Sequence, residues 1–158
     1  MQTLKNEMLT IQVSEHGAEL QSIRKDDYEY LWQGNPEYWG RRSPVLFPIV
    51  GSVWEKCFRV DGKVYEMGQH GFARDMDFEL VSAADTEVWY RLKSSEKTLA
   101  AYPWPFVLEI GYRLEGNSVK VLWKVTNPGD TEMFFQIGAH PAFNYPGYDP
   151  DAVDRGVV

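Results

Sequence analysis

Alternation of apolar and polar residues dominates the chain, with the period of two that is typical of half-buried β-strands. It is seen at residues 9–13, at residues 87–92 and most clearly in two neighbouring stretches, residues 106–114 and 119–125. Residues two apart lie on one face of a strand. We therefore expect the last two stretches to pair and to bury one apolar face, made of Phe106, Leu108, Ile110, Tyr112, Val119, Val121, Trp123 and Val125.

Turn signals separate these stretches. Asp61-Gly62, between two short apolar segments, is the strongest hairpin signal in the chain. Residues 127–130 (NPGD) close the last long strand, and the alternation of Met133, Phe135 and Ile137 predicts the start of another.

Helical pattern is confined to residues 94–101, and Pro103 should end that helix. Short strands joined by turns, without helical crossovers, predict an all-β fold, specifically an antiparallel β-sandwich. No linker or repeat marks a domain boundary, so we expect residues 1–158 to belong to a single domain. Two stretches fit no strand pattern, residues 34–51 and 68–76, and long irregular segments on a β scaffold often carry function.

Charge and composition narrow the functional classes. The net charge of −7, without a basic run, disfavours a nucleic-acid partner. No apolar stretch is long enough to span a membrane, and the first residues lack the apolar core of a signal peptide. The single Cys57 cannot form an internal disulfide, which suits a reducing compartment. We expect a cytoplasmic protein without a metal site or cofactor, since neither a His/Cys cluster nor a phosphate-binding glycine loop is present.

His140 is the first candidate for chemistry. If the strand stays extended, alternation places it on the face opposite Ile137, and Pro141 favours an extended backbone before it. An imidazole, with an ordinary pKa of about 6.5, can carry a proton near neutral pH. The alternative is a histidine that simply hydrogen-bonds a backbone carbonyl at a strand end.

His70 lies in a polar, glycine-flanked segment, where we expect it to be accessible and able to hydrogen-bond a hydroxyl. Arg74 and Asp75 next to it are either an ion pair without further role or a substrate-binding arginine oriented by a carboxylate. The pair Arg41-Arg42 is open in the same way: it is a solvated pair, or one arginine points into a site.

Four segments occur in an order that resembles the LacX-type branch of the aldose 1-epimerase (galactose-mutarotase-like) family. They are residues 30–34 (YLWQG), 38–48 (YWGRRSPVLFP), 70–75 (HGFARD) and 140–144 (HPAFN). The opening stretch, residues 11–20 with GAEL at 17–20, is similar too. The similarity runs through nearly the whole chain.

The resemblance implies a galactose-mutarotase-like supersandwich that binds a sugar on its concave face. It implies that His140 is the general acid for the ring oxygen and that His70 binds and polarises the substrate, while Arg41 or Arg42 holds sugar hydroxyls. The expected substrate is a free hexose. The alternatives are a hexose 6-phosphate, because Arg74 matches an arginine that related hexose-6-phosphate epimerases use near the phosphate, and a non-catalytic sugar-binding module.

The family's general base, a glutamate in the C-terminal part, has no counterpart in a matching context of this sequence. We therefore expect this chain to correspond to the N-terminal portion of the family fold, with the base lying beyond Val158. A truncated sandwich should expose strand edges and apolar surface through which copies could associate.

Overall fold

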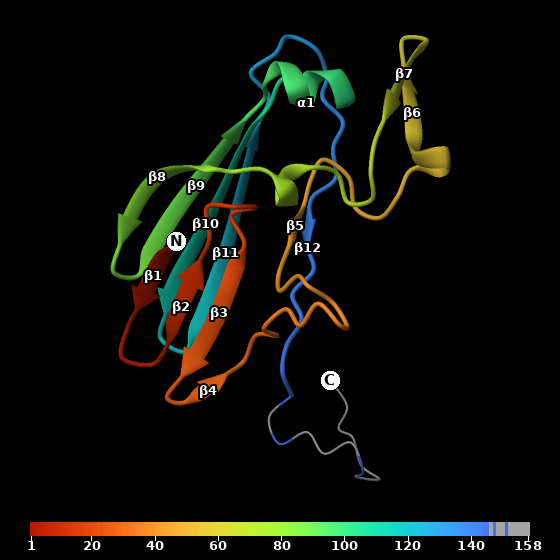
Figure 1. The fold of residues 1–158 in the computed structure, drawn as a ribbon. Helices are drawn as coiled ribbons and strands as arrows, with labels where there is room; N and C mark the ends of the chain where they lie inside the picture. Colours follow the sequence, from red (N-terminus) through yellow and green to blue (C-terminus); the bar gives the residue numbers. More distant parts are fainter. Residues whose placement is uncertain (146, 148–150, 152–158) are drawn as a thin grey trace.

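Two four-stranded antiparallel sheets form the body of the computed structural model, which describes residues 1–145, 147 and 151 (Figure 1). The first sheet has the order β1-β2-β3-β4 and the second the order β11-β10-β9-β8. Their bounds are β1 Gln2–Lys5, β2 Thr10–Val13, β3 Leu20–Lys25 and β4 Tyr28–Glu29, then β8 Glu79–Ala84, β9 Glu87–Lys93, β10 Val107–Glu115 and β11 Ser118–Thr126. The first sheet lies over one face of the second, so the two make a pair of layers.

Smaller elements lie to one side of these layers. β5 (Val45–Leu46) pairs with β12 (Gly138–Ala139), and β6 (Cys57–Val60) forms a hairpin with β7 (Lys63–Glu66). The only α-helix of the described residues is α1, Glu96–Ala101; single 3₁₀ turns cover Trp54–Lys56 and Ala73–Asp75. The predicted all-β antiparallel fold, the Asp61-Gly62 hairpin and the short helix before Pro103 are confirmed.

The core lies between the two layers, and buried tyrosines connect one layer to the other. Ile110 and Tyr90 have no exposed surface. The Tyr90 hydroxyl donates to the carbonyl of Val13, and the Tyr112 hydroxyl donates to that of Ala18. Burial raises the pKa of Tyr90 to about 12, so its hydroxyl keeps its proton and remains a donor. These bonds fix how the first sheet sits on the second.

The predicted core residues of β11 are only partly right. In the β10–β11 register Trp123 lies opposite Ile110 and Val121 opposite Tyr112, so they share the apolar face as the alternation indicated. Yet Trp123 is 39% exposed and Val121 is 44% exposed, whereas Ile110 is 0% exposed. β11 is the edge strand of its sheet. Near its beginning, Val119 lines a cavity of about 320 Å³ with Leu9, Ile23 and others.

The strand predicted to open at Met133 does not form. Residues 127–137, all of them described, contain no strand, and only β12 follows them. The backbone N–H of Gln136 donates to the carbonyl of Pro48 instead of to a sheet neighbour, and Phe134 and Phe135 remain 61% and 41% exposed. The alternation is present in the sequence, but in the described part of the chain this segment is not paired with a strand.

Substituting two residues that face each other across the β10–β11 register tests this burial difference. Ile110→Ala should lower the free energy of unfolding by about 2–5 kcal/mol, because it opens a cavity in a closed core. Trp123→Ala should cost only about 1 kcal/mol, the scale of an ordinary substitution. Urea denaturation monitored by circular dichroism measures both. Equal losses would mean that Trp123 is covered in solution, and repeating the measurement at several protein concentrations would show whether another copy covers it.

Candidate functional site

The pairing of β5 with β12 brings two distant segments together. Ala139 lies opposite Val45, and the next residue, His140, donates its backbone N–H to the carbonyl of Pro44 at 3.1 Å. Two residues on, the N–H of Ala142 donates to the carbonyl of Arg42. The histidine is thus held in extended backbone at the end of a short ladder, beside the arginine pair. Figure 1 shows the two strands running side by side.

The segment of residues 68–76 packs against Phe47, the residue that follows β5. Gly71 forms a parallel bridge with Phe47, and the N–H groups of Phe72 and Ala73 both donate to the Phe47 carbonyl. Gly71 has φ +71°, and a Cβ at this position would lie 2.2 Å from the Phe47 oxygen. Only glycine allows this approach. The glycine therefore sets the position of the histidine before it.

The two histidines converge. The ring centroids of His70 and His140 are 6.3 Å apart, with the rings inclined at 25°. The edge-on ring of Trp39 lies 5.2 Å from His140 on the other side. His140 is exposed and His70 is half-buried, so a small molecule at the surface could contact both imidazoles. The roles that the resemblance implies for the two histidines require such proximity, because both would act on one substrate.

His70 is fixed more tightly than His140. The Nδ1 atom of His70 accepts a hydrogen bond from the backbone N–H of Gly51 at 2.9 Å, and the backbone N–H of His70 donates to the Gly51 carbonyl at 2.7 Å. Burial lowers the pKa of His70, and the electrostatic influence of Arg74, His140 and Arg41 lowers it further. The imidazole of His70 is therefore held neutral.

Arg41 and Arg74 meet at Asp75. Arg41 Nη2 donates to Asp75 Oδ1 at 2.8 Å, and Arg74 Nη2 donates to the carbonyl of Gln69. Arg74 Nε lies 3.6 Å from Asp75 Oδ2, too far for a hydrogen bond, and is buried without a partner among the described residues. The structure thus brings Arg41, Arg74 and Asp75 together beside His70.

Arg42 is not brought to this cluster. Its Nη1 donates to the carbonyl of Gln21, and its side chain covers Gly34. Its backbone N–H and that of Ser43 both donate to Glu19 Oε1. Of the two neighbouring arginines, Arg41 is therefore the one that faces the histidines, and Glu19 holds the turn that separates their directions.

Four residues of the site were not singled out from the sequence. Trp39 lies against the His140 ring, and Glu19 orients the arginine turn. Gln136 Oε1 accepts the N–H of Val50, and Asn144 Nδ2 donates to the carbonyls of Glu29 and Leu31. Three of the four lie in segments that carried the resemblance; only Gln136 had no signal of its own.

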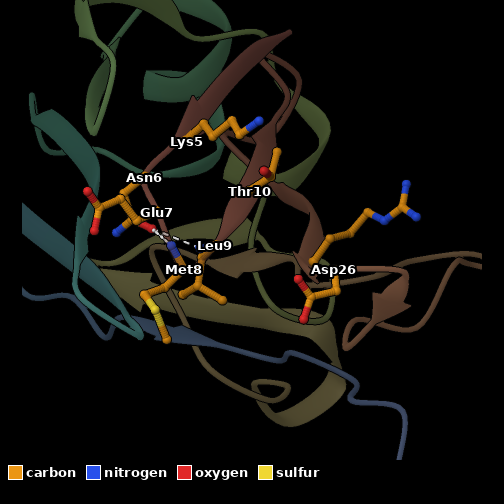
Figure 2. Close-up of a pocket in the computed structure, with 8 residues that line it drawn as sticks. Lys5, Asn6, Glu7, Met8, Leu9, Thr10 and Asp26 are labelled. Carbon is orange, nitrogen blue, oxygen red and sulfur yellow. Dashed lines mark hydrogen bonds between the residues drawn. The ribbon is translucent and has the colours of Figure 1, made fainter.

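The cavity shown in Figure 2 is separate from the site of the two histidines. It measures about 430 Å³ and is lined by the β1–β2 turn and by residues of β2, β3 and the following turn. Its central acceptor, Asn6 Oδ1, is already taken by the N–H groups of Met8 and Leu9. No histidine lines it, so it does not extend the site. In the described part of the chain, no group of three His, Cys, Asp or Glu residues could hold a metal ion, and no helix is long and apolar enough to cross a membrane.

The fold and the paired histidines define the class of protein. The family model for aldose 1-epimerase matches residues 1–157, so the chain belongs to the aldose 1-epimerase family. The structure has the galactose-mutarotase-like fold: it superposes with a TM-score of 0.92 and 40% identity on a galactose mutarotase related enzyme from Lactobacillus acidophilus. A galactose mutarotase-like protein from Lactobacillus casei ATCC 334 gives a TM-score of 0.91 at 38% identity.

Within the family the chain is similar to the LacX proteins of Lactococcus lactis subsp. lactis. The chromosomal and plasmid forms are both 40% identical to it in an alignment of 151 residues that covers 90% of this chain and 50% of each relative. The two solved structures are likewise matched over 96% of this chain but over 51% and 52% of their own. The chain thus spans about half the length of these relatives.

The lowered pKa of His70 predicts a pH effect on stability. Below about pH 6.5, the ordinary pKa of histidine, the unfolded chain takes up a proton that folded His70 does not. Stability then falls as the pH drops towards the lowered pKa of His70. His70→Asn, which tolerates the φ of +66° at this position, should lose less stability than the wild type between pH 6.5 and 5. Thermal unfolding across this range measures it, and equal slopes would contradict a neutral folded His70.

Proposed function

We propose that this chain supplies the acid half of a mutarotase site, which interconverts the α- and β-anomers of a free hexose. The main observation in support is that the imidazoles of His70 and His140 lie 6.3 Å apart, next to Arg41 and Asp75. Family membership supports the reaction class, because it is the aldose 1-epimerase model that matches the chain.

Two proton transfers make the reaction. Ring opening needs a proton given to the ring oxygen while another is removed from the anomeric hydroxyl, so one acid and one base suffice. His140 is the acid in this proposal, since it is exposed and its ring has no hydrogen-bond partner among the described residues. His70, held neutral, donates a hydrogen bond that positions and polarises the sugar.

Arg41 holds sugar hydroxyls in this proposal. Its guanidinium is half-buried and only partly used by Asp75, so further N–H donors remain for a ligand. Trp39, half-buried beside His140, offers an apolar ring face on which a sugar can lie. Asp75 is engaged by Arg41 and orients it. The general base is supplied by polypeptide that corresponds to the other half of the relatives.

A hexose 6-phosphate is the second candidate substrate, and one observation favours it. Arg74 Nε is a buried donor without a hydrogen-bond partner in the described structure, and Arg41 lies close by. Phosphate oxygens suit paired guanidinium groups. Polarimetry distinguishes the two substrates in a single assay.

Polarimetry of freshly dissolved α-D-galactose or α-D-glucose tests the proposal. The 158-residue chain alone should give little acceleration. A chimera that joins it to the C-terminal half of Lactococcus lactis LacX should accelerate mutarotation without added metal or cofactor. Acceleration of only glucose 6-phosphate would assign the phosphate substrate. Saturable sugar binding without acceleration on either the free hexoses or glucose 6-phosphate would indicate a non-catalytic sugar-binding module.

His140→Ala in that chimera should lower kcat by roughly 100- to 10,000-fold with a smaller change in KM, because a general acid acts in the transition state. His70→Ala should change both constants, since the side chain also binds. His16→Ala is the matched control: this third histidine is bonded to Asp77, and its loss should leave both constants unchanged. A loss in His16→Ala equal to that in His140→Ala would contradict the assignment.

A further inference from the structure

Gly51 and His70 form a reciprocal pair of hydrogen bonds. The Gly51 N–H donates to His70 Nδ1 at 2.9 Å, while the His70 N–H donates to the Gly51 carbonyl at 2.7 Å. Both residues have positive φ, +79° for Gly51 and +66° for His70. The side chain and the backbone of His70 are thus both bonded to one residue.

The segment that contains Gly51 is held in turn by Gln136. The Val50 N–H donates to Gln136 Oε1 at 2.9 Å, and the Gln136 N–H donates to the carbonyl of Pro48 at 2.8 Å. On the other side, Gly71 packs directly against the Phe47 carbonyl, which fixes the backbone after His70. The Gly51 N–H therefore points at His70 from a loop whose position is fixed by these contacts.

A backbone N–H can only donate, so the Nδ1 that receives it must be the unprotonated nitrogen of the ring. In the neutral imidazole the single proton is then on Nε2. None of the described residues is hydrogen-bonded to His70 Nε2. That N–H is left for a ligand.

We infer that the backbone N–H of Gly51 sets the tautomer of His70, making it a neutral Nε2–H donor to a sugar oxygen and leaving proton transfer to His140. The inference rests on the proposed function for its ligand, and Gly51 acts in it as a positioning residue. The two imidazoles would look interchangeable from their types and spacing; the difference between them lies in one backbone bond.

The surroundings of His70 act in the same direction. A charged His70 would carry an N–H on Nδ1, opposed to the Gly51 N–H, donor against donor. The charged groups near it are Arg74 and Arg41, with the Asp75 carboxylate bonded to Arg41, and His140 across from it. Burial and the electrostatic influence of Arg74, His140 and Arg41 lower the pKa of His70 as well.

Nitrogen-15 NMR of the imidazoles in the 158-residue chain, without sugar, tests the inference directly. The chain has three histidines, so His→Gln variants assign the signals. His70 should show the Nε2–H pattern of two-bond couplings, a scalar coupling between Gly51 N and His70 Nδ1, and a pKa below the ordinary value of histidine. A proton on Nδ1, or an even mixture of tautomers, would overturn the inference.

Two glycines offer a matched pair of variants. Gly51 and Gly62 have nearly equal φ, +79° and +78°, and a Cβ at either has no neighbour within 4 Å. Alanine keeps the backbone N–H but introduces the same backbone strain at both, and only at Gly51 does a backbone shift that relieves this strain move the donor of the bond to His70. We expect Gly51→Ala to weaken this bond, to raise the pKa of His70 and to populate its Nδ1–H tautomer, whereas Gly62→Ala leaves all three unchanged. If Gly51→Ala lost the coupling between Gly51 N and His70 Nδ1 while the tautomer and pKa of His70 stayed those of the wild type, Gly51 would not be the determinant.

The proposed function can fail separately. Polarimetry on the chimera asks whether sugar is turned over, whereas the NMR measurement asks only how the His70 ring is protonated. An Nε2–H tautomer in a chimera without mutarotase activity would support the role of Gly51 and contradict the proposed reaction. In an active chimera, Gly51→Ala should raise KM, with a steeper loss of binding below pH 6.5 than Gly62→Ala; identical pH profiles for the two variants would overturn the role in binding.

Discussion

Phe47 connects the core of this protein to its candidate site. Its side chain is fully buried and contacts the rings of Phe72, Tyr102, Phe106 and Phe135. Its carbonyl accepts two N–H groups from the segment that follows Gly71. The site loops are therefore bonded to a residue that cannot move without disturbing the core, because interiors are closely packed. The spacing of His70 from His140 depends on this one residue.

That anchoring explains how two exposed loops can present an ordered set of groups. His140 is aligned by the β5–β12 ladder, His70 by Gly51, and Arg41 by Asp75. Each is held by a neighbour that takes no part in the proposed chemistry. A site arranged in advance loses less entropy when it binds a ligand. The alignment of these groups fits a reaction that needs only a proton donor, a proton acceptor and a positioned sugar.

Among the described residues the second sheet ends at β11, whose nine residues contain no proline and pair with β10 alone. Its inward face carries Val121 and Trp123, both substantially exposed. An unpaired strand edge next to apolar surface favours contact with further polypeptide. The relatives are about twice as long as this chain.

The alternation of apolar residues, the Asp-Gly turn and the capped helix after Ser95 were determined by the sequence alone, because each depends on residues close together in the chain. The candidate groups His70, His140, Arg74 and Asp75 were also identified from the sequence, which left Arg41 and Arg42 as alternatives. Three matters were decided by tertiary structure: that Trp123 is exposed, that residues 133–137 form no strand, and that Arg41 rather than Arg42 faces the histidines. Each depends on a partner distant in the sequence: a facing layer, a free strand edge, or Glu19 and Gln21. Local pattern states which face a residue occupies, but only the packed fold supplies what covers it.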